Sequence, residues 1–155
     1  MIIAGTGHRP DKAGGYSEEA SEALIKIVMD GILSHDNQDI TAIISGMALG
    51  WDQALAEAAL RLNIPLWCYI PFKRQESVWP MESRLNYQHL LESAQRVIFC
   101  SPGLYAPQKM QIRNQRMVDD ADLILAYFDG SSGGTRNCIR YAEKVKKPIV
   151  NLYPK

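Results

Sequence analysis

The stretch Asp129-Gly130-Ser131-Ser132-Gly133-Gly134-Thr135 decides the fold of this chain. It follows an apolar run, residues 123–128, and precedes residues 136–146, where apolar side chains recur at helical spacing. A strand, a glycine-rich turn and a helix in this order bring backbone N–H groups and the positive end of a helix close to a bound phosphate. The stretch therefore predicts a phosphate-binding loop, although a tight strand-to-helix turn without a ligand also favours glycine.

The composition indicates one domain over residues 1–155, because 46% of the 155 residues are hydrophobic and can form a core. Lys plus Arg and Asp plus Glu both number 17, so no net charge would attract nucleic acid or an anionic membrane. We therefore expect a small-molecule ligand, and neither a nucleic-acid nor a membrane partner.

The cysteines and the start of the chain predict a cytoplasmic protein. The 3 cysteines have no close pairing, which is typical of a reducing compartment. Residues 1–5 lack the basic segment of a signal peptide. No apolar run reaches the roughly 18 residues that a membrane helix needs. The histidines are far apart and no G-x-G-x-x-G motif follows the first strand, so we expect neither a metal nor a dinucleotide cofactor.

Strands and helices are predicted to alternate along the chain. Apolar runs predict strands over residues 2–4, 40–44, 66–70, 97–100, 123–128 and 149–153. Helical spacing predicts helices between them, beginning near Ser17, Trp51, Pro80, Gln108 and Arg136, with Asp36-Asn37 ending the first. This alternation predicts an α/β fold, a Rossmann-like three-layer sandwich with a mainly parallel sheet and helices on both faces.

Every loop of unusual composition follows a predicted strand. These loops cover residues 5–10, 45–50, 71–75, 101–105 and 129–135. In open parallel sheets, ligands bind beyond the carboxyl ends of the strands. We therefore expect the loops to share one rim of the sheet and to form a binding site there.

Three segments together resemble the SLOG superfamily, a Rossmann-like group that contains the DNA-processing protein A family and the LONELY GUY phosphoribohydrolases. Residues 45–52, Ser-Gly-Met-Ala-Leu-Gly-Trp-Asp, are similar to the SG-x-A-x-G-x-D signature of the DNA-processing proteins. Residues 110–119 resemble the arginine-bearing helix before the last loop, and Gly133-Gly134-Thr135 matches the closing GGT element. Small bacterial and phage SLOG proteins are similar through residues 7–10 and 129–135. The resemblance implies a phosphorylated nucleoside or nucleotide-derived ligand and a homo-oligomer.

One position departs from the enzymes of this group. Cys138 stands where LONELY GUY enzymes have a catalytic glutamate, three residues after the Thr of the closing element. N-glycosidic hydrolysis needs a carboxylate that stabilises positive charge on the sugar or attacks the anomeric carbon. Cys138 is either part of the apolar helix face or a thiol activated by the helix N-terminus. If the chain is an enzyme, another rim carboxylate must act, and the candidates are Asp129, Glu76, Asp52 and Glu82.

The predicted ligand-binding residues come from the glycine-bearing loops and the arginine-bearing helix. The guanidinium groups of Arg9 and Arg113 would hold a phosphate, although Arg9 could also form a surface ion pair. His8 could contact the ligand or be structural, and Asp52 could contact it or cap a helix. The full set is Gly5, Thr6, Gly7, His8, Arg9, Ser45, Gly46, Gly50, Asp52, Arg113, Asn114, Asp129, Gly130, Ser131, Ser132, Gly133, Gly134 and Thr135.

The sequence thus predicts a protein that binds a phosphorylated nucleoside or nucleotide-derived ligand as a sensor, carrier or sequestering protein. The phosphate would lie between residues 45–50 and 131–135. The alternative is an N-glycosidic hydrolase that acts on a nucleoside monophosphate. A DNA-handling role is disfavoured because the chain has no net positive charge.

Overall fold

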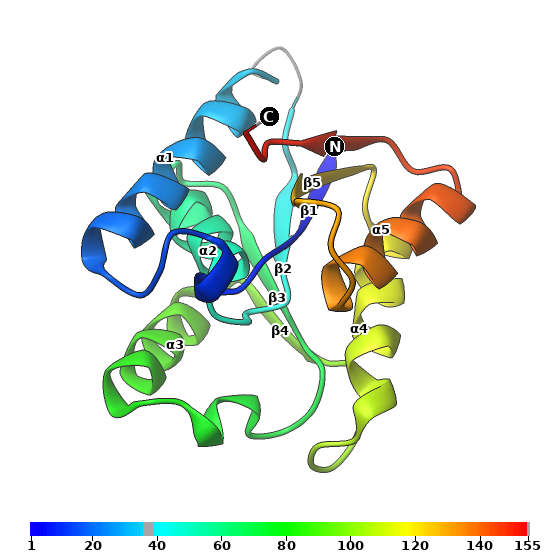
Figure 1. The fold of residues 1–155 in the computed structure, drawn as a ribbon. Coiled ribbons are helices and arrows are strands. Elements are labelled where there is room, and N and C mark those ends of the chain that lie inside the picture. The colour runs from blue at the N-terminus through cyan, green and yellow to red at the C-terminus, as the bar shows by residue number, and fades with distance from the viewer. Residues whose placement is uncertain (36–38, 155) are drawn as a thin grey trace.

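The computed structural model describes residues 1–35 and 39–154, and it contains a parallel sheet of 6 strands (Figure 1). The strand order is β4-β3-β2-β1-β5-β6, and every pairing between neighbours is parallel. The expected α/β, Rossmann-like fold is confirmed. The strands are β1 (Ile2–Gly7), β2 (Ala42–Ser45), β3 (Leu66–Ile70), β4 (Arg96–Phe99), β5 (Leu123–Tyr127) and β6 (Ile149–Asn151).

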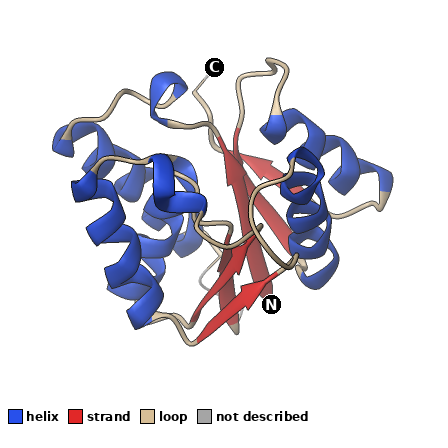
Figure 2. Cartoon of the chain, turned by 90° about the horizontal axis from the view of Figure 1, so that it is seen from below, coloured by secondary structure: helices blue, strands red, loops and turns tan. Residues whose placement is uncertain are grey.

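Helices cover both faces of this sheet, which lies edge-on between them in Figure 2. One face carries α1 (Glu18–Leu33), α2 (Trp51–Arg61) and α3 (Met81–Ser93), and the other carries α4 (Pro107–Asp120) and α5 (Gly134–Lys144). Two short 3₁₀ helices, η1 (Pro10–Lys12) and η2 (Gln75–Val78), follow β1 and β3. No helix in the described part of the chain is long and apolar enough to cross a membrane.

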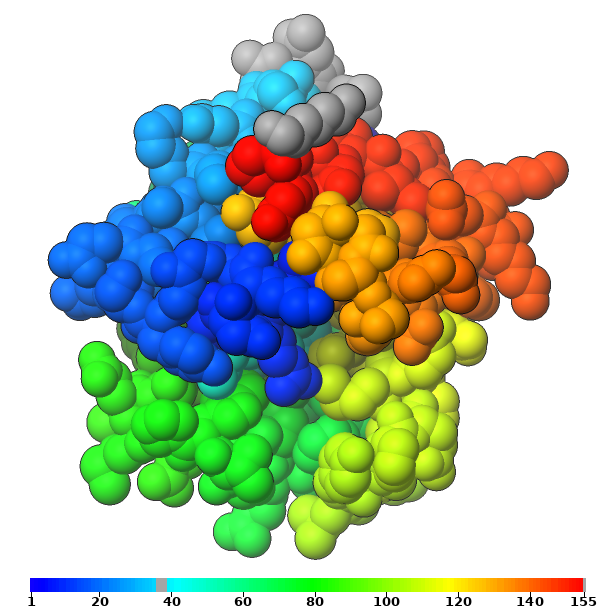
Figure 3. All heavy atoms as spheres, viewed as in Figure 1, coloured from blue at the N-terminus to red at the C-terminus, as the bar shows by residue number. Residues whose placement is uncertain are grey.

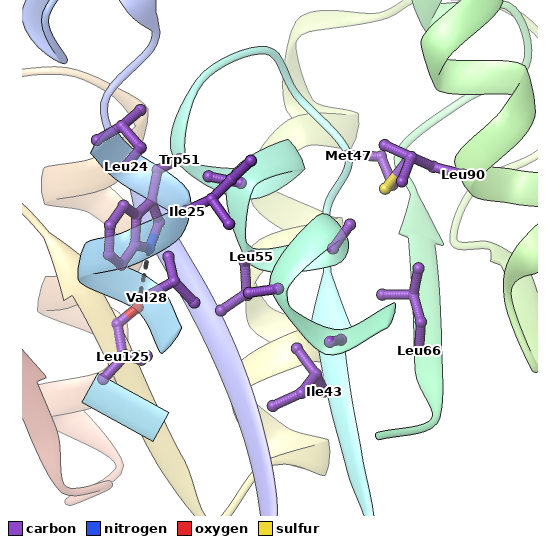
Figure 4. Close-up of a cluster of buried hydrophobic side chains, with 14 of the residues drawn as sticks. Leu24, Ile25, Val28, Ile43, Met47, Trp51, Leu55, Leu66, Leu90 and Leu125 are labelled. Atoms are coloured by element: carbon purple, nitrogen blue, oxygen red, sulfur yellow. Dashed lines mark hydrogen bonds between the residues drawn. The ribbon is translucent and has the colours of Figure 1, made fainter. Parts of the chain in front are cut away.

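The core has two parts, one on each side of the sheet. The first joins α1, α2 and α3 to the sheet through side chains such as Leu24, Val28 and Leu55 (Figure 4). In the same part, Nε1 of Trp51 donates to the carbonyl of Leu125 at 3.2 Å. Met117 belongs to the second part, under α4 and α5. Each fully buried Leu, Ile or Met stabilises the fold by about 1.5–3 kcal/mol.

The predicted element boundaries agree with the structure to within a few residues. Ser17 caps α1, because its Oγ accepts from the N–H of Ala20 at 3.1 Å, an interaction worth about 1 kcal/mol. The last helix begins at Gly134 rather than at residue 136, since Gly133 supplies the N-cap with φ +139°. The last strand ends at Asn151 rather than 153. The predicted end of the first helix, Asp36-Asn37, lies outside the described residues.

The strand order reverses at the centre of the sheet. From β1 the chain moves through β2 and β3 to β4 on one side, and then returns to β5 and β6 on the other. In doubly wound sheets the crevice at such a reversal, beyond the carboxyl ends of the strands, is the usual place for a ligand. Here the reversal lies between β1 and β5, so the loops that follow these two strands border it.

Candidate functional site

A cavity of about 340 Å³ lies at this reversal, and we call it the switch-point cavity. The loops after β1 and β5 meet beside it: in Figure 3 the dark blue and the orange atoms touch at the front of the molecule. Eleven of the predicted ligand-binding residues line it, which are Thr6, Gly7, His8, Arg9, Asp52, Arg113, Asn114, Ser132, Gly133, Gly134 and Thr135. The remaining predicted residues lie outside its walls.

Sequence reasoning missed five residues of the cavity wall, Asp11, Lys12, Ala48, Met110 and Met117. Met117 is buried in the core, and both methionines also line the cavity. Helical spacing could have found them, because they lie three and four positions from Arg113 on α4. Lys12 gave a weaker signal, since it is a charged residue just beyond the predicted loop 5–10.

The loop between β5 and α5 has open space beside its glycines. A Cβ added at Gly130, Gly133 or Gly134 would meet no heavy atom within 4 Å. Gly130 and Gly133 have positive φ angles, +95° and +139°, which explains glycine at these two positions. Gly134 has neither a positive φ nor a close neighbour, so packing does not require glycine there. No side chain caps α5, so the amides of its first turn can bind an anion.

The glycines near β1 have a different role. A Cβ at Gly5 would lie 2.3 Å from the Leu55 side chain, and one at Gly7 would lie 2.4 Å from Trp51. A Cβ at Gly50, whose φ is +91°, would lie 2.6 Å from the carbonyl oxygen of His8. These glycines let α2 approach β1 closely, and Gly5 and Gly50 are not part of the cavity wall.

The polar groups of the turn after β2 form their hydrogen bonds within the protein. Oγ of Ser45 donates to the carbonyl of Asp52 at 2.7 Å and accepts from the N–H of Met47 at 3.1 Å. The carbonyl of Gly46 accepts from Arg113 at 2.6 Å and from Gln75 at 3.3 Å. Ser45 and Gly46 therefore brace this turn and lie outside the cavity, so within residues 45–50 only Ala48 faces it.

Arg113 is a buried part of the cavity wall, with an exposed fraction of 3%. Its Nη1 donates to the carbonyls of Gly46 and, at 3.4 Å, Tyr69. Its Nε donates to Oδ1 of Asn114 at 2.9 Å. Burial lowers the pKa of Arg113, while the negative charge of Asp52 opposes that shift. Arg113 thus holds the turn after β2 in place and also supplies a charge to the cavity.

Asp52 lies in the first turn of α2 and has an exposed fraction of 7%. Its Oδ2 accepts from the N–H of Ala48 at 3.3 Å. Burial raises its pKa, against the opposing effects of Arg113, the Ala48 hydrogen bond and Arg9. Asp52 and Arg113 line the same cavity, yet within the described chain no direct ion pair joins them. Functional acids and bases are usually found in such places, as buried groups in a cavity with a shifted pKa.

Asp129 organises the loop after β5 from outside the cavity. Its Oδ1 accepts from the N–H of Ser131 at 2.8 Å and from Oγ of Ser131 at 2.5 Å. Nε2 of His8 lies 2.8 Å from the same oxygen, and Lys12 donates to Oγ of Ser131 at 2.8 Å. The two hydrogen bonds from Ser131, which have the largest effect, and the contact with His8 lower the pKa of Asp129 to about 2. Asp129, Gly130 and Ser131 therefore shape the loop that carries the lining residues.

The other candidates for catalysis lie elsewhere. Glu76 is in η2 and Glu82 is in the first turn of α3, and neither lines the cavity. The thiol of Cys138 is packed in the second part of the core, and burial raises its pKa to about 11. A thiol in this environment is a poor nucleophile.

The loops after β3 and β4 meet each other at the rim, where the N–H of Lys73 donates to the carbonyl of Gly103 at 2.9 Å. They do not reach the switch-point cavity. Within residues 1–35 and 39–154, no three His, Cys, Asp or Glu side chains are placed together to hold a metal ion.

Comparison with known protein families and sequences finds relatives over most of the chain. The model of the YspA SLOG family matches residues 3–151. An uncharacterised SPbeta prophage-derived protein of Bacillus subtilis, YoqJ, is 34% identical over 133 residues, which cover 76% of this chain and 77% of that protein. A UPF0398 protein of Bacillus cereus is 24% identical over 160 residues, covering 98% of this chain and 87% of that protein.

Solved structures share the fold at low sequence identity. DNA processing protein A of Helicobacter pylori, whose structure concerns single-stranded DNA binding, superposes with a TM-score of 0.66 at 18% identity. That match covers 96% of this chain but only 63% of the other. The molybdenum cofactor carrier protein of Chlamydomonas reinhardtii superposes with a TM-score of 0.58 at 15% identity, covering 97% of this chain and 74% of the carrier.

Proposed function

Since the chain belongs to the YspA SLOG family, we propose that it binds a phosphorylated nucleoside or nucleotide-derived ligand in the switch-point cavity. The open N-terminus of α5 carries this proposal. Gly134 is a glycine that neither its φ nor its neighbours require, and it lines the cavity as the first residue of α5. A missing Cβ at this position lets a phosphate approach the amides.

The charges around the cavity support an anionic ligand. Arg9 and Lys12 line the cavity from the loop after β1, and Arg113 lines it from α4. A guanidinium group can hold two phosphate oxygens at once, and an ammonium group adds a positive charge. We propose that the phosphate lies between residues 132–135 and the side chains of Arg9 and Lys12, with the charge of Arg113 deeper in the cavity, rather than against the turn after β2, whose polar groups already have partners.

The size of the cavity favours a mononucleotide or a sugar phosphate. At about 340 Å³ it lies at the lower end of the usual range for small-molecule sites, roughly 300–1,000 Å³. A dinucleotide would extend well beyond it. The function would be that of a sensor, carrier or sequestering protein, as the name of the molybdenum cofactor carrier suggests for one structural relative. Cytoplasmic location and homo-oligomer formation remain predictions.

Titration calorimetry with inorganic phosphate and with AMP tests this proposal. Wild-type protein should bind at least one of them at millimolar concentration or below. The variant Gly134→Ala should keep its stability, because the added Cβ enters open space, and should bind at least about tenfold more weakly because that space is the route to the amides. Asn137→Ala, on the exposed part of the same helix, serves as the control. Absence of binding, or equal binding by Gly134→Ala, would contradict the proposal.

The second candidate is hydrolysis of the N-glycosidic bond of a nucleoside monophosphate. Asp52 favours it, because this buried carboxyl with a raised pKa lines the cavity. Asp129, Glu76 and Glu82 lie outside the cavity wall. Release of free base from a panel of nucleoside monophosphates would support this function if Asp52→Asn abolished it and Glu76→Gln did not. Absence of base release from the whole panel would exclude it.

A DNA-binding role is a weaker candidate. The likeness to DNA processing protein A, at 18% identity, concerns the fold. The chain carries 17 basic and 17 acidic residues, so it lacks the excess of positive charge that non-specific DNA binding requires. Unchanged mobility of single-stranded DNA at low salt would exclude this role.

A further inference from the structure

Asp52 and Arg113 form the floor of the switch-point cavity. Both line it and both are more than nine-tenths buried, whereas Gly133 and Gly134, which also line it, are exposed. The cavity therefore has an exposed end, with the amides of α5, and a buried end, with one carboxylate and one guanidinium group.

Each of these two charged groups keeps one atom without a partner in the described chain. For Asp52 only Oδ2 has a donor, the N–H of Ala48, and Oδ1 has none. For Arg113, Nε and Nη1 donate to protein oxygens, and Nη2 does not. Among the described residues, every fully enclosed side-chain nitrogen or oxygen has a hydrogen-bond partner. Because Oδ1 of Asp52 and Nη2 of Arg113 have none, these two atoms are accessible. The surface that their residues share is the wall of the cavity.

A carboxylate oxygen only accepts hydrogen bonds, and a guanidinium nitrogen only donates them. A phosphate at this end would suit Arg113 but would be repelled by Asp52. A hydroxyl group both donates and accepts, so neighbouring hydroxyls can satisfy both atoms without bringing another charge into a buried place.

We propose that Asp52 and Arg113 bind the hydroxyl groups of a ribose ring whose 5-phosphate lies at the N-terminus of α5. This inference rests on the proposed function and names the ligand class more closely, as a ribose 5-phosphate unit. A sugar is the group joined directly to the phosphate, so it reaches the floor of a cavity of this size before a base does. Burial raises the pKa of Asp52, which agrees with its place in the enclosed part of the cavity.

Affinities for three probes separate the two ends of the cavity. Inorganic phosphate reports on the α5 end alone, ribose 5-phosphate reports on both ends, and 2-deoxyribose 5-phosphate lacks one hydroxyl. Wild-type protein should bind ribose 5-phosphate about tenfold or more tightly than either other probe, since each charge-assisted hydrogen bond contributes roughly that factor.

The variant Asp52→Asn should bring the affinity for ribose 5-phosphate to within a few-fold of that for inorganic phosphate. It keeps an oxygen for the N–H of Ala48, and circular dichroism checks its fold. Glu57→Gln removes a carboxylate from the same helix, at a residue that contacts Arg61 at 3.4 Å, and should keep the wild-type ratio. The comparison of ribose with deoxyribose on wild-type protein does not depend on any variant folding.

This inference would be overturned if the ratio of the affinity for ribose 5-phosphate to that for inorganic phosphate were equal in wild type and Asp52→Asn. Phosphate binding would then still support the proposed function. The inference would also be overturned if nucleoside monophosphates were discriminated by their bases and ribose 5-phosphate bound no better than phosphate, because Asp52 would then contact a base. Binding of no probe and no nucleotide at millimolar concentration would remove the proposed function itself.

Discussion

The guanidinium group of Arg113 lies directly against the Cα of Gly46. A Cβ at residue 46 would lie 2.3 Å from Nη1, and the Gly46 carbonyl accepts from that atom at 2.6 Å. We predict that Gly46→Ala lowers the free energy of unfolding by about 1–3 kcal/mol, because a buried side chain must move. Urea unfolding measures this, with Gly134→Ala as the matched control, whose Cβ enters open space. Equal stability of the two variants would contradict the packing described here.

Arg9 should contribute to anion binding without contributing to stability. Its side chain is exposed and lines the cavity. We predict that Arg9→Gln weakens phosphate binding about five- to tenfold through the loss of a charge-assisted hydrogen bond, and leaves urea unfolding unchanged. Arg140→Gln makes the same charge change on α5 at a residue outside the cavity wall and should keep wild-type affinity. Equal loss in both variants would indicate a general charge effect.

Acid should remove the contribution of Asp129 to stability. Its pKa is about 2 in the folded protein, below the ordinary value of 3.8, so its carboxylate stabilises the fold above about pH 4. That contribution is lost as the pH falls from about 4 to about 2. We predict that the stability difference between wild type and Asp129→Asn shrinks over this range, as measured by urea unfolding. Ser131→Ala, which lacks the Oγ donor, should show a smaller change, and parallel profiles for wild type and Asp129→Asn would refute the assignment.

Asp52 should have the opposite dependence on pH. Its folded pKa is raised above 3.8, so the unfolded chain releases this proton at a lower pH than the folded protein does. The wild-type free energy of unfolding should therefore fall, relative to Asp52→Asn, as the pH rises from about 4 through the raised pKa, and remain lower above it. Urea unfolding between pH 4 and 8 measures this difference, and a constant difference would contradict it.

Cys138 should be inert in the folded protein. It is 1% exposed and its pKa is raised to about 11, whereas Cys100 is only partly buried. We predict that iodoacetamide at pH 8 modifies Cys100 first and leaves Cys138 unmodified until the protein unfolds. Mass spectrometry of peptides from treated protein identifies the modified residue. Rapid modification of Cys138 would reopen its assignment as a nucleophile.

The fold could be predicted because its signals are local. Apolar runs bounded by glycine and proline gave the strands, and the cap at Ser17 gave the start of α1. The last helix begins earlier than predicted because Gly133 is its N-cap, whereas the error at the end of the last strand came from a tertiary contact. The side chain of Asn151 bonds to both backbone groups of Phe128, and this interaction ends the ladder early.

The candidate site was predicted less completely, because a glycine-rich turn has the same composition whether it binds a ligand or allows close packing. Gly7 makes room for Trp51 of α2 and Gly50 for the backbone of His8 and Arg9, while Gly134 makes room for no protein atom. Sequence alone does not distinguish a glycine that allows close packing from one that leaves space for a ligand. The residue that packs against the glycine, where there is one, is far away along the chain. For the same reason Arg113, expected at the rim, also braces the distant carbonyl of Gly46.

The two loops that border the switch-point cavity come from opposite ends of the chain, for His8 and Asp129, which lie in contact, are 121 positions apart. During synthesis on the ribosome, β1 emerges first and must wait for β5 before its second edge is paired. A nascent chain that has formed β1 to β4 has no site to offer. Binding of the proposed ligand would therefore require that β1 and β5 are already paired, and it would stabilise only states in which both loops are in place.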